Sequence, residues 1–125
     1  MVIDTSVILA ILFKEKHSTW AVTQMNTYAS ELRMSTVNLT EVLIHLQDRQ
    51  PQLFHKLEEQ LLFQSGIRFI PPDIEQSKIA ANARIKFPLN LGDCFAYSLA
   101  VQEDCPILTL DKDFKTLPHV LIHPY

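Results

Sequence analysis

Glycine and cysteine are scarce in this chain, with two of each among its 125 residues. Two glycines are too few for the glycine-rich loops that cradle phosphate in many nucleotide-binding proteins. Cys94 and Cys105 are too few for a disulfide framework. Cys94 follows an acid that would raise its pKa and has no histidine beside it, so we expect a buried apolar side chain rather than a nucleophile. Asp4 interrupts the early apolar run that a secretory signal would need, and we therefore expect a cytoplasmic protein.

Long hydrophobic runs and surplus positive charge are also lacking. The longest apolar run, Val7 to Phe13, is far shorter than the roughly 20 residues that cross a bilayer, so we expect a soluble protein with no membrane partner. The formal net charge is −3, whereas proteins that bind nucleic acid normally cluster Lys and Arg. Contact with nucleic acid would therefore depend on a local cationic patch and bound metal. The length, with 47% hydrophobic residues, fits one domain over residues 1–125.

Strand and helix patterns alternate along the whole chain. Short apolar strands separated by helices predict an α/β sandwich of three layers, with a central parallel sheet of four or five strands flanked by helices. The expected strands are Met1–Ile3, Arg33–Thr36, Ile67–Ile70, Pro106–Thr109 and Val120–Ile122. The expected helices cover residues 5–13, 17–32, 38–50, 51–65, 73–86 and 91–101.

Acidic residues stand where these strands end or where helices start. Asp4 ends the first strand, Asp111 follows the fourth, and Glu41 and Asp93 lie in the first turns of helices. Ligands of parallel sheets bind beyond the carboxyl ends of the strands, so this topology should bring the acids together. Three or four carboxylates without a His or Cys cluster favour a hard cation, Mg²⁺ or Mn²⁺. Metal-dependent phosphodiester chemistry is the leading interpretation.

Each acid alone also has a purely structural explanation, because carboxylates are favoured near helix N-termini. Asn38 and Glu41 have the spacing of a capping box, and Asp4 could form a turn before Ser6. Asp93 would satisfy free N–H groups in a first turn. What favours a site is that Asp4 and Asp93 both border apolar core segments, where acids tend to be retained for function.

Other chemistries fit less well. Of the histidines, His119 and His123 are four residues apart but fall in a predicted loop and strand rather than on one helix face, which disfavours zinc. A phosphoacceptor domain would need a paired acid near the first strand and a lysine after a late strand. Here Asp4 has no acidic neighbour, and Lys112 lies in the turn.

Four segments together resemble the PIN-domain family, especially VapC-type toxins of prokaryotic toxin–antitoxin pairs. They are Met1–Ser6, Thr36–Glu41, Leu89–Ala100 and Ile107–Phe114. The resemblance covers essentially the whole chain, and Leu89–Ala100 is its most specific part. It implies a magnesium- or manganese-dependent ribonuclease, usually a dimer, held inactive by a cognate antitoxin. A catalytically silent PIN module that binds RNA or protein, or a PIN nuclease of RNA processing, is the alternative.

The resemblance also implies roles for particular residues. Asp4 and Asp93 would be the principal metal ligands, Glu41 a further ligand or a base that orients water, and Asp111 or Asp113 the fourth acid. Thr5 or Ser6 would hydrogen-bond a carboxylate or water, unless they only cap the helix. The cations expected to steer the RNA backbone are Arg84, Lys86, Lys112 and Lys115. The segment from Asn82 to Leu91 is short and free of glycine compared with relatives, which affects substrate selection rather than metal binding.

The first four helices carry more bulky apolar residues than a small sheet needs. This surplus suggests a surface for a dimer or partner. We expect it around Leu9, Leu12, Phe13, Trp20 and Leu46.

Overall fold

Five parallel strands form the centre of the computed structural model, which describes residues 1–125. The strands are β1 (Val2–Ile3), β2 (Arg33–Ser35), β3 (Arg68–Ile70), β4 (Ile107–Leu108) and β5 (Leu121–Ile122), in the spatial order β3-β2-β1-β4-β5. All four pairings are parallel. The parallel sheet predicted from sequence is confirmed, including its fifth strand.

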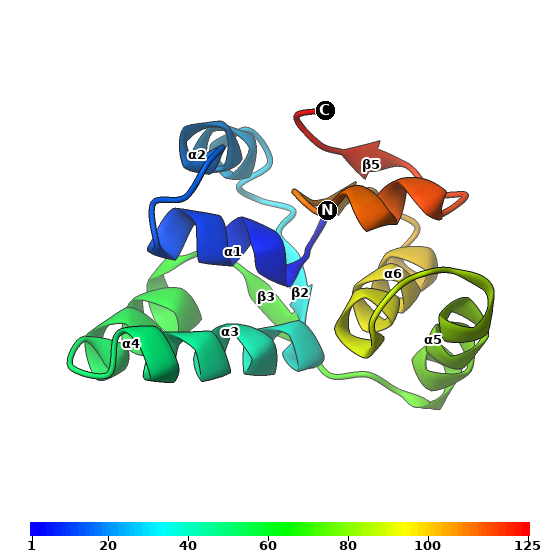
Figure 1. Ribbon diagram of the computed structural model, residues 1–125, viewed down its shortest axis with the longest axis horizontal. Coiled ribbons are helices and arrows are strands. Elements are labelled where there is room, and N and C mark those ends of the chain that lie inside the picture. The colour runs from blue at the N-terminus through cyan, green and yellow to red at the C-terminus, as the bar shows by residue number, and fades with distance from the viewer.

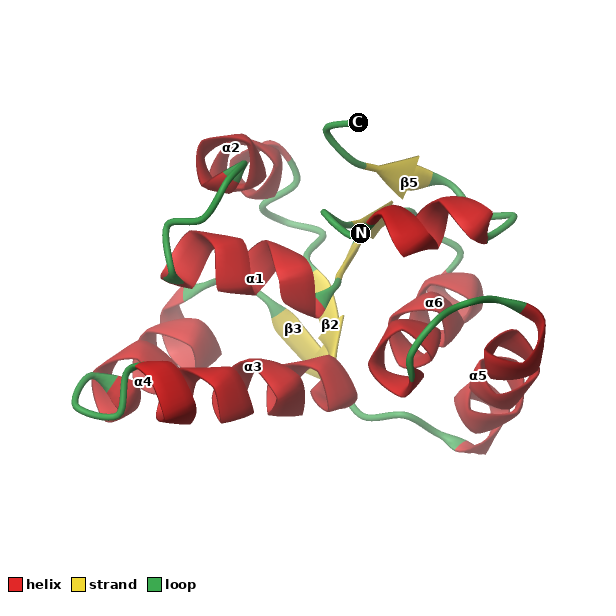
Figure 2. Cartoon of the chain, viewed as in Figure 1, coloured by secondary structure: helices red, strands yellow, loops and turns green.

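Six α-helices and one 3₁₀ helix connect the strands. They are α1 (Thr5–Leu12), α2 (Ser18–Thr27), α3 (Thr36–Arg49), α4 (Phe54–Gln64), α5 (Ile74–Lys86), α6 (Leu91–Glu103) and the 3₁₀ helix η1 (Lys112–Thr116). Figure 1 shows α1, α3 and α4 on one side of the sheet and α5 and α6 on the other. Figure 2 shows the same three layers with the short strands between the helices.

Alternate residues of each strand enter separate cores, as the pleat of a strand requires. Ile3 and Leu108 belong to the core beneath α1 to α4, where they meet Met34. Val2 and Ile107 belong to the core beneath α5 and α6. Because both faces of the sheet are covered, the strands are apolar on both sides.

The strand order reverses between β1 and β4. From β1 the chain adds β2 and β3 on one side of the sheet, then crosses to add β4 and β5 on the other. Beyond the carboxyl ends of such a strand pair lies the crevice where open α/β sheets bind ligands. Asp4 directly follows β1, and Thr109 and Asp111 follow β4, so polar residues of both strands lie at this crevice.

Three local predictions were wrong. The N-cap of α3 is Ser35, whose side chain accepts from the Val37 N–H, and not Asn38. The second helix ends at Thr27 instead of continuing to residue 32. Leu46 is fully buried on the inner face of α3 and therefore cannot contribute to a contact surface.

No helix is both long and apolar enough to cross a bilayer.

Candidate active site

Asp4 lies buried at the end of β1, with 2% of its surface exposed. Its carboxylate accepts a hydrogen bond from Ser6 Oγ at 2.6 Å and another from Thr109 Oγ1 at 2.8 Å. Burial nevertheless raises the pKa of Asp4 to about 6, and the charge of Asp111 adds to the rise. The two hydroxyls and the nearby Val7 N–H act in the opposite direction but do not offset burial. The fold thus holds a carboxyl group where its charged form is disfavoured.

The same two hydroxyls join the ends of β1 and β4. Ser6 Oγ accepts from the Leu110 N–H at 3.0 Å, and Thr109 Oγ1 accepts from the Asp111 N–H at 2.9 Å. Asp111 in turn caps η1, because its Oδ1 accepts from the Asp113 N–H at 2.9 Å. Asp111 is therefore held beside Asp4 by a continuous set of hydrogen bonds.

Asp93 lies in the first turn of α6, whose N-cap is Asn90. The Asn90 side chain accepts from the Asp93 N–H at 2.8 Å and fixes this turn. Only 9% of Asp93 is exposed. Burial raises its pKa to about 7, followed by repulsion from Asp111 and Asp4, with a smaller contribution from Glu41. The carboxylates of Asp4 and Asp111, which follow β1 and β4, therefore lie close enough to Asp93 to repel its charge.

Glu41 joins this group from α3. Its Oε1 accepts from Thr5 Oγ1 at 2.7 Å and from Asn38 Nδ2 at 3.1 Å, and Asn38 Nδ2 also reaches the Gly92 carbonyl at 3.0 Å. A Cβ atom at Gly92 would collide with the Glu41 carboxylate, so any larger residue would force that carboxylate to move. The absence of a side chain at residue 92 thus allows Glu41 to lie against the start of α6, next to Asp93.

Asn38 is a site residue that sequence reasoning placed wrongly. It is fully buried in the first turns of α3 and its amide bridges α1, α3 and α6. The pair of polar residues at positions 38 and 41 was visible in the sequence, but it was interpreted as a capping box. The same spacing of three residues puts both side chains on one helix face, and that pattern was the available signal.

Oxygen donors of this kind suit a hard divalent cation. No three His, Cys, Asp or Glu side chains are close enough as they stand to hold an ion between them. Mg²⁺, however, keeps several waters and is usually bound through one or two carboxylates. Two buried carboxyl groups with raised pKa values, beside two further acids, fit that requirement, because a cation would relieve both burial and repulsion.

The remaining predicted residues lie around the group of four acids. Asp113 is exposed and contributes to no pKa shift at Asp4 or Asp93, unlike Asp111. Lys112 and Lys115 lie on η1, and their ammonium groups are 4.6 and 5.4 Å from the centroid of the Tyr125 ring. Their contact with Tyr125 was not anticipated.

Two more predicted cations, Arg84 and Lys86, are exposed in the last turn of α5. The positive charge of Arg84 acts on the Cys94 thiol, whose pKa is raised mainly by burial. The end of α5 therefore lies close to the start of α6, where Asp93 is found.

These features define a class of protein: a three-layer α/β fold that gathers carboxyl groups at the point where the order of a parallel sheet reverses. Acids contributed by β1, α3, α6 and the segment after β4 act on one another through their charges.

Comparison with known proteins narrows this class. The family model of the PIN domain matches residues 1–120, and the chain belongs to the PIN domain family. It is 30% identical over 122 residues to ribonuclease VapC42 of Mycobacterium tuberculosis, covering 91% of this chain and 92% of that protein. It is 27% identical to ribonuclease VapC28 of the same species, with 91% of each covered.

Solved structures share the fold. VapC20 of Mycobacterium tuberculosis, described as a toxin that cleaves the sarcin-ricin loop, superposes with a TM-score of 0.83 at 14% identity, covering 98% of each chain. FitAcB from Neisseria gonorrhoeae superposes with a TM-score of 0.79 at 18% identity, covering 98% of this chain and 96% of that one. The PIN-like α/β sandwich predicted from the sequence is thereby confirmed.

Proposed function

We propose that this protein is a metal-dependent endoribonuclease, the toxin of a VapBC-type toxin–antitoxin pair, acting through Mg²⁺ or Mn²⁺. The observation that carries the proposal is the acidic group itself. Asp4 and Asp93 are buried, their pKa values are raised to about 6 and about 7, and Asp111 and Glu41 lie within reach of their charge. Curated relatives that match over most of their length are named ribonucleases.

Asp4 and Asp93 are the proposed principal metal ligands. We assign the fourth acid to Asp111 rather than Asp113, because only Asp111 raises the pKa values of the two buried acids. A bound divalent ion would polarise the scissile phosphate and lower the pKa of a water molecule. Glu41, held by Thr5 and Asn38, is placed either to ligate or to orient that water.

The hydroxyls of Thr5 and Ser6 are already committed to Glu41 and Asp4. We therefore propose that they orient the two carboxylates, and any contact with substrate would be additional. The RNA backbone is proposed to meet exposed cations on two sides of the acidic group. These are Arg84 and Lys86 on α5, and Lys112 and Lys115 on η1.

We further propose that residues 1–125 act as one domain, in the cytoplasm, as a homodimer bound by a cognate antitoxin. Solved structures with the same fold include toxin–antitoxin complexes from Klebsiella pneumoniae and Rickettsia felis. Leu9, Leu12, Phe13 and Trp20 remain partly exposed around α1 and the start of α2, and form the proposed contact surface. Light scattering of the purified protein tests the dimer, and a monomer at high concentration would contradict it.

A second candidate is a silent PIN module that binds RNA without cutting it. The observation in its favour is that no three acidic side chains already surround a common point. Incubation of the purified protein with total RNA separates the two functions. We expect cleavage with Mn²⁺, none with chelator, and none by Asp93→Asn.

A matched control distinguishes loss of the site from loss of any acid. Asp113→Asn removes a neighbouring but exposed carboxylate and should leave cleavage unchanged. Equal cleavage by Asp93→Asn and the wild type would indicate a contaminating nuclease. RNA binding without cleavage by the wild type would favour the silent module.

A further inference from the structure

A cavity of about 300 Å³ opens between α5, α6 and the segment that follows η1. This volume is at the lower end of the range for small-molecule sites. Its lining combines two cations, an amide and two aromatic rings. Among the residues that line it are Lys78, Asn82, Lys86, Phe87, Tyr97 and Pro118.

The cavity is connected to the acidic group through α6. Tyr97 follows Asp93 by four residues on α6, which places the two side chains on the same helix face about 6 Å apart along the axis. Phe87 is the C-cap of α5, and only three residues separate it from the start of α6. Pro118 comes soon after η1, whose N-cap is Asp111. One turn of α6 therefore separates Asp93 from a residue that lines the cavity.

The interior is aromatic. The Tyr97 ring meets Phe87 edge to face at 6.5 Å and His119 at 5.7 Å between ring centroids. His119 is fixed by a hydrogen bond of 2.7 Å between its Nε2 and the Cys105 carbonyl. Every nucleobase has a flat face that stacks on such rings, which makes an aromatic cavity suitable for an unpaired base.

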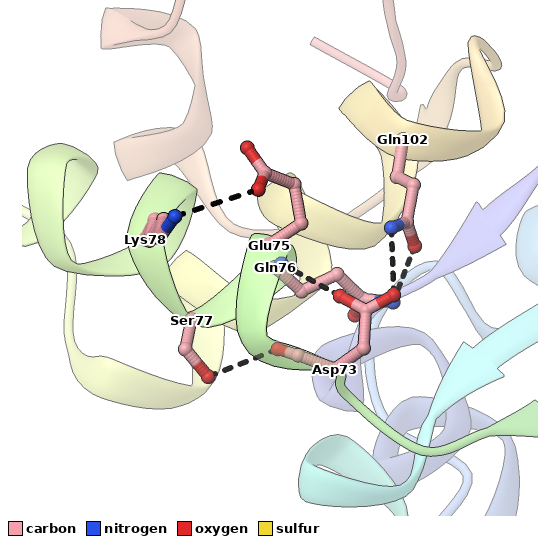
Figure 3. A network of polar contacts seen from close by, with 6 residues as sticks. All are labelled: Asp73, Glu75, Gln76, Ser77, Lys78 and Gln102. Carbon is pink, nitrogen blue, oxygen red and sulfur yellow. Dashed lines mark hydrogen bonds and ion pairs between the residues drawn. The ribbon is translucent and has the colours of Figure 1, made fainter.

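The rim is cationic. Lys86 is exposed and forms no ion pair, while Lys78 lies 3.9 Å from Glu75 (Figure 3). No carboxylate lines the cavity. The unpaired ammonium group of Lys86 suits a phosphate attached to the bound base.

The walls are held in place by a polar network that joins the start of α5 to the end of α6. Asp73 caps α5 and accepts from Gln102 Nε2 at 2.9 Å, and Gln102 Oε1 accepts from Gln76 Nε2 at 2.6 Å (Figure 3). These bonds fix the spacing of the two helices at the end far from Asp93. The cavity is therefore formed before any ligand arrives, which reduces the cost of binding.

We propose that this cavity receives an unpaired base of the RNA strand next to the scissile phosphate, stacked on Tyr97, with Lys86 contacting the adjoining phosphate. The proposal rests on the ribonuclease function proposed above and assigns it a determinant of cleavage-site choice. A second cavity of about 370 Å³ provides a contrast, because its lining includes three acids beside Arg33, whereas no acid lines the first.

The test compares Tyr97→Leu and Lys86→Ala with matched controls. Tyr28→Leu alters the aromatic residue of the second cavity, and Lys56→Ala removes an exposed lysine of α4. The readouts are the Kd for single-stranded RNA in the presence of chelator, kcat and KM with Mn²⁺, and the cut positions mapped by sequencing the RNA ends.

We expect Tyr97→Leu to weaken binding roughly ten- to a hundredfold, as loss of one base–aromatic stack does, and to change the distribution of cut sites. Tyr97→Phe should retain both properties, since it keeps the ring. Lys86→Ala should raise KM and reduce the salt dependence of binding. Both controls should behave as the wild type.

Equal binding and equal cut sites for Tyr97→Leu and Tyr28→Leu, in a protein that cleaves RNA, would refute the cavity and leave the nuclease intact. Binding that depends on Tyr97 in a protein that never cleaves would refute the nuclease and retain the cavity as a base-binding site. A wild-type protein that neither binds nor cleaves RNA would refute both proposals.

Discussion

Replacing Asp93 by Asn should stabilise the metal-free protein, and increasingly so as the pH rises. The folded protein holds the Asp93 proton up to about pH 7, whereas the unfolded chain releases it near the ordinary pKa of 3.8. Between these values the folded state binds more protons than the unfolded state, so stability falls as the pH rises through this window. Asn carries no charge at any of these pH values, so the variant should not show this pH-dependent fall in stability.

The magnitude follows from the two pKa values. One pKa unit corresponds to about 1.4 kcal/mol. Relative to a carboxyl group with the same pKa in both states, Asp93 therefore lowers the free energy of unfolding by roughly 2 kcal/mol at pH 5, where only the unfolded chain is ionised, and by roughly 4 kcal/mol at pH 8. Between pH 5 and pH 8 the wild type should lose roughly 2–3 kcal/mol more than Asp93→Asn does. Any constant effect of the amide cancels in this comparison.

Urea denaturation in the presence of chelator, at pH 5 and pH 8, measures the difference. Asp113→Asn is the control, because that residue is exposed and lies outside the coupled acids. Saturating Mn²⁺ at pH 8 should stabilise the wild type and have little effect on Asp93→Asn. If wild type and Asp93→Asn lose the same stability between the two pH values, the pKa of Asp93 is not raised in the folded protein.

Three further predictions concern the surroundings of the acids. Thr109→Val removes a donor to Asp4 and leaves the Asp111 N–H unpaired. Urea denaturation should therefore show a loss of about 1–3 kcal/mol in the free energy of unfolding. The pH–rate profile should move to higher pH, because the hydrogen bond that this variant loses lowers the pKa of Asp4 in the wild type, and an unchanged profile would contradict the role of this hydroxyl. Gly92→Ala pushes a Cβ into the Glu41 carboxylate and should abolish RNA cleavage measured against wild type, with retained activity arguing against a role for Glu41. Binding of Mn²⁺ at pH 6 should release protons, because the raised carboxyls must ionise to ligate; calorimetric heats that do not depend on the ionisation heat of the buffer would exclude this.

Much of the fold could be predicted because each local pattern was consistent with the global one. Short apolar strands alternating with amphipathic helices permit few arrangements other than a covered parallel sheet. Helix ends were predictable where a cap acts on its own turn. Asp73 caps α5 as expected, and Gly66 follows α4 with a positive φ of 75°. These signals depend only on nearby residues.

Asn38 shows where local reasoning failed. Its sequence spacing to Glu41 matched a capping box, but its amide is used by Thr5, Glu41 and the Gly92 carbonyl. Two of these partners are distant in the chain, so the residue's role was set by tertiary contacts that no local pattern contains. Ser35, one turn earlier, was left to cap α3.

The choice between Asp111 and Asp113 likewise needed the sheet. β4 pairs with β1 in the register Ile3 to Leu108, and the Asp4 N–H donates to the Leu108 carbonyl at 3.2 Å. This register brings Thr109 to Asp4 and makes Asp111 the neighbour of both buried acids. The sequence offered two acids two residues apart and no means of choosing between them.

The energies argue against helix capping as the sole reason for these acids. A carboxylate near a helix N-terminus contributes about 0.3–1 kcal/mol, yet the raised pKa of Asp4 corresponds to a cost of about 3 kcal/mol when it ionises. The hydrogen bonds of the Asp4 carboxylate come from the hydroxyls of Ser6 and Thr109, with the Val7 N–H of α1 only nearby, and Glu41 bonds side chains rather than backbone. A domain of this size is stable by only about 5–15 kcal/mol, so acids retained for capping alone would be a net loss. A bound divalent cation, as proposed above, would compensate their charge.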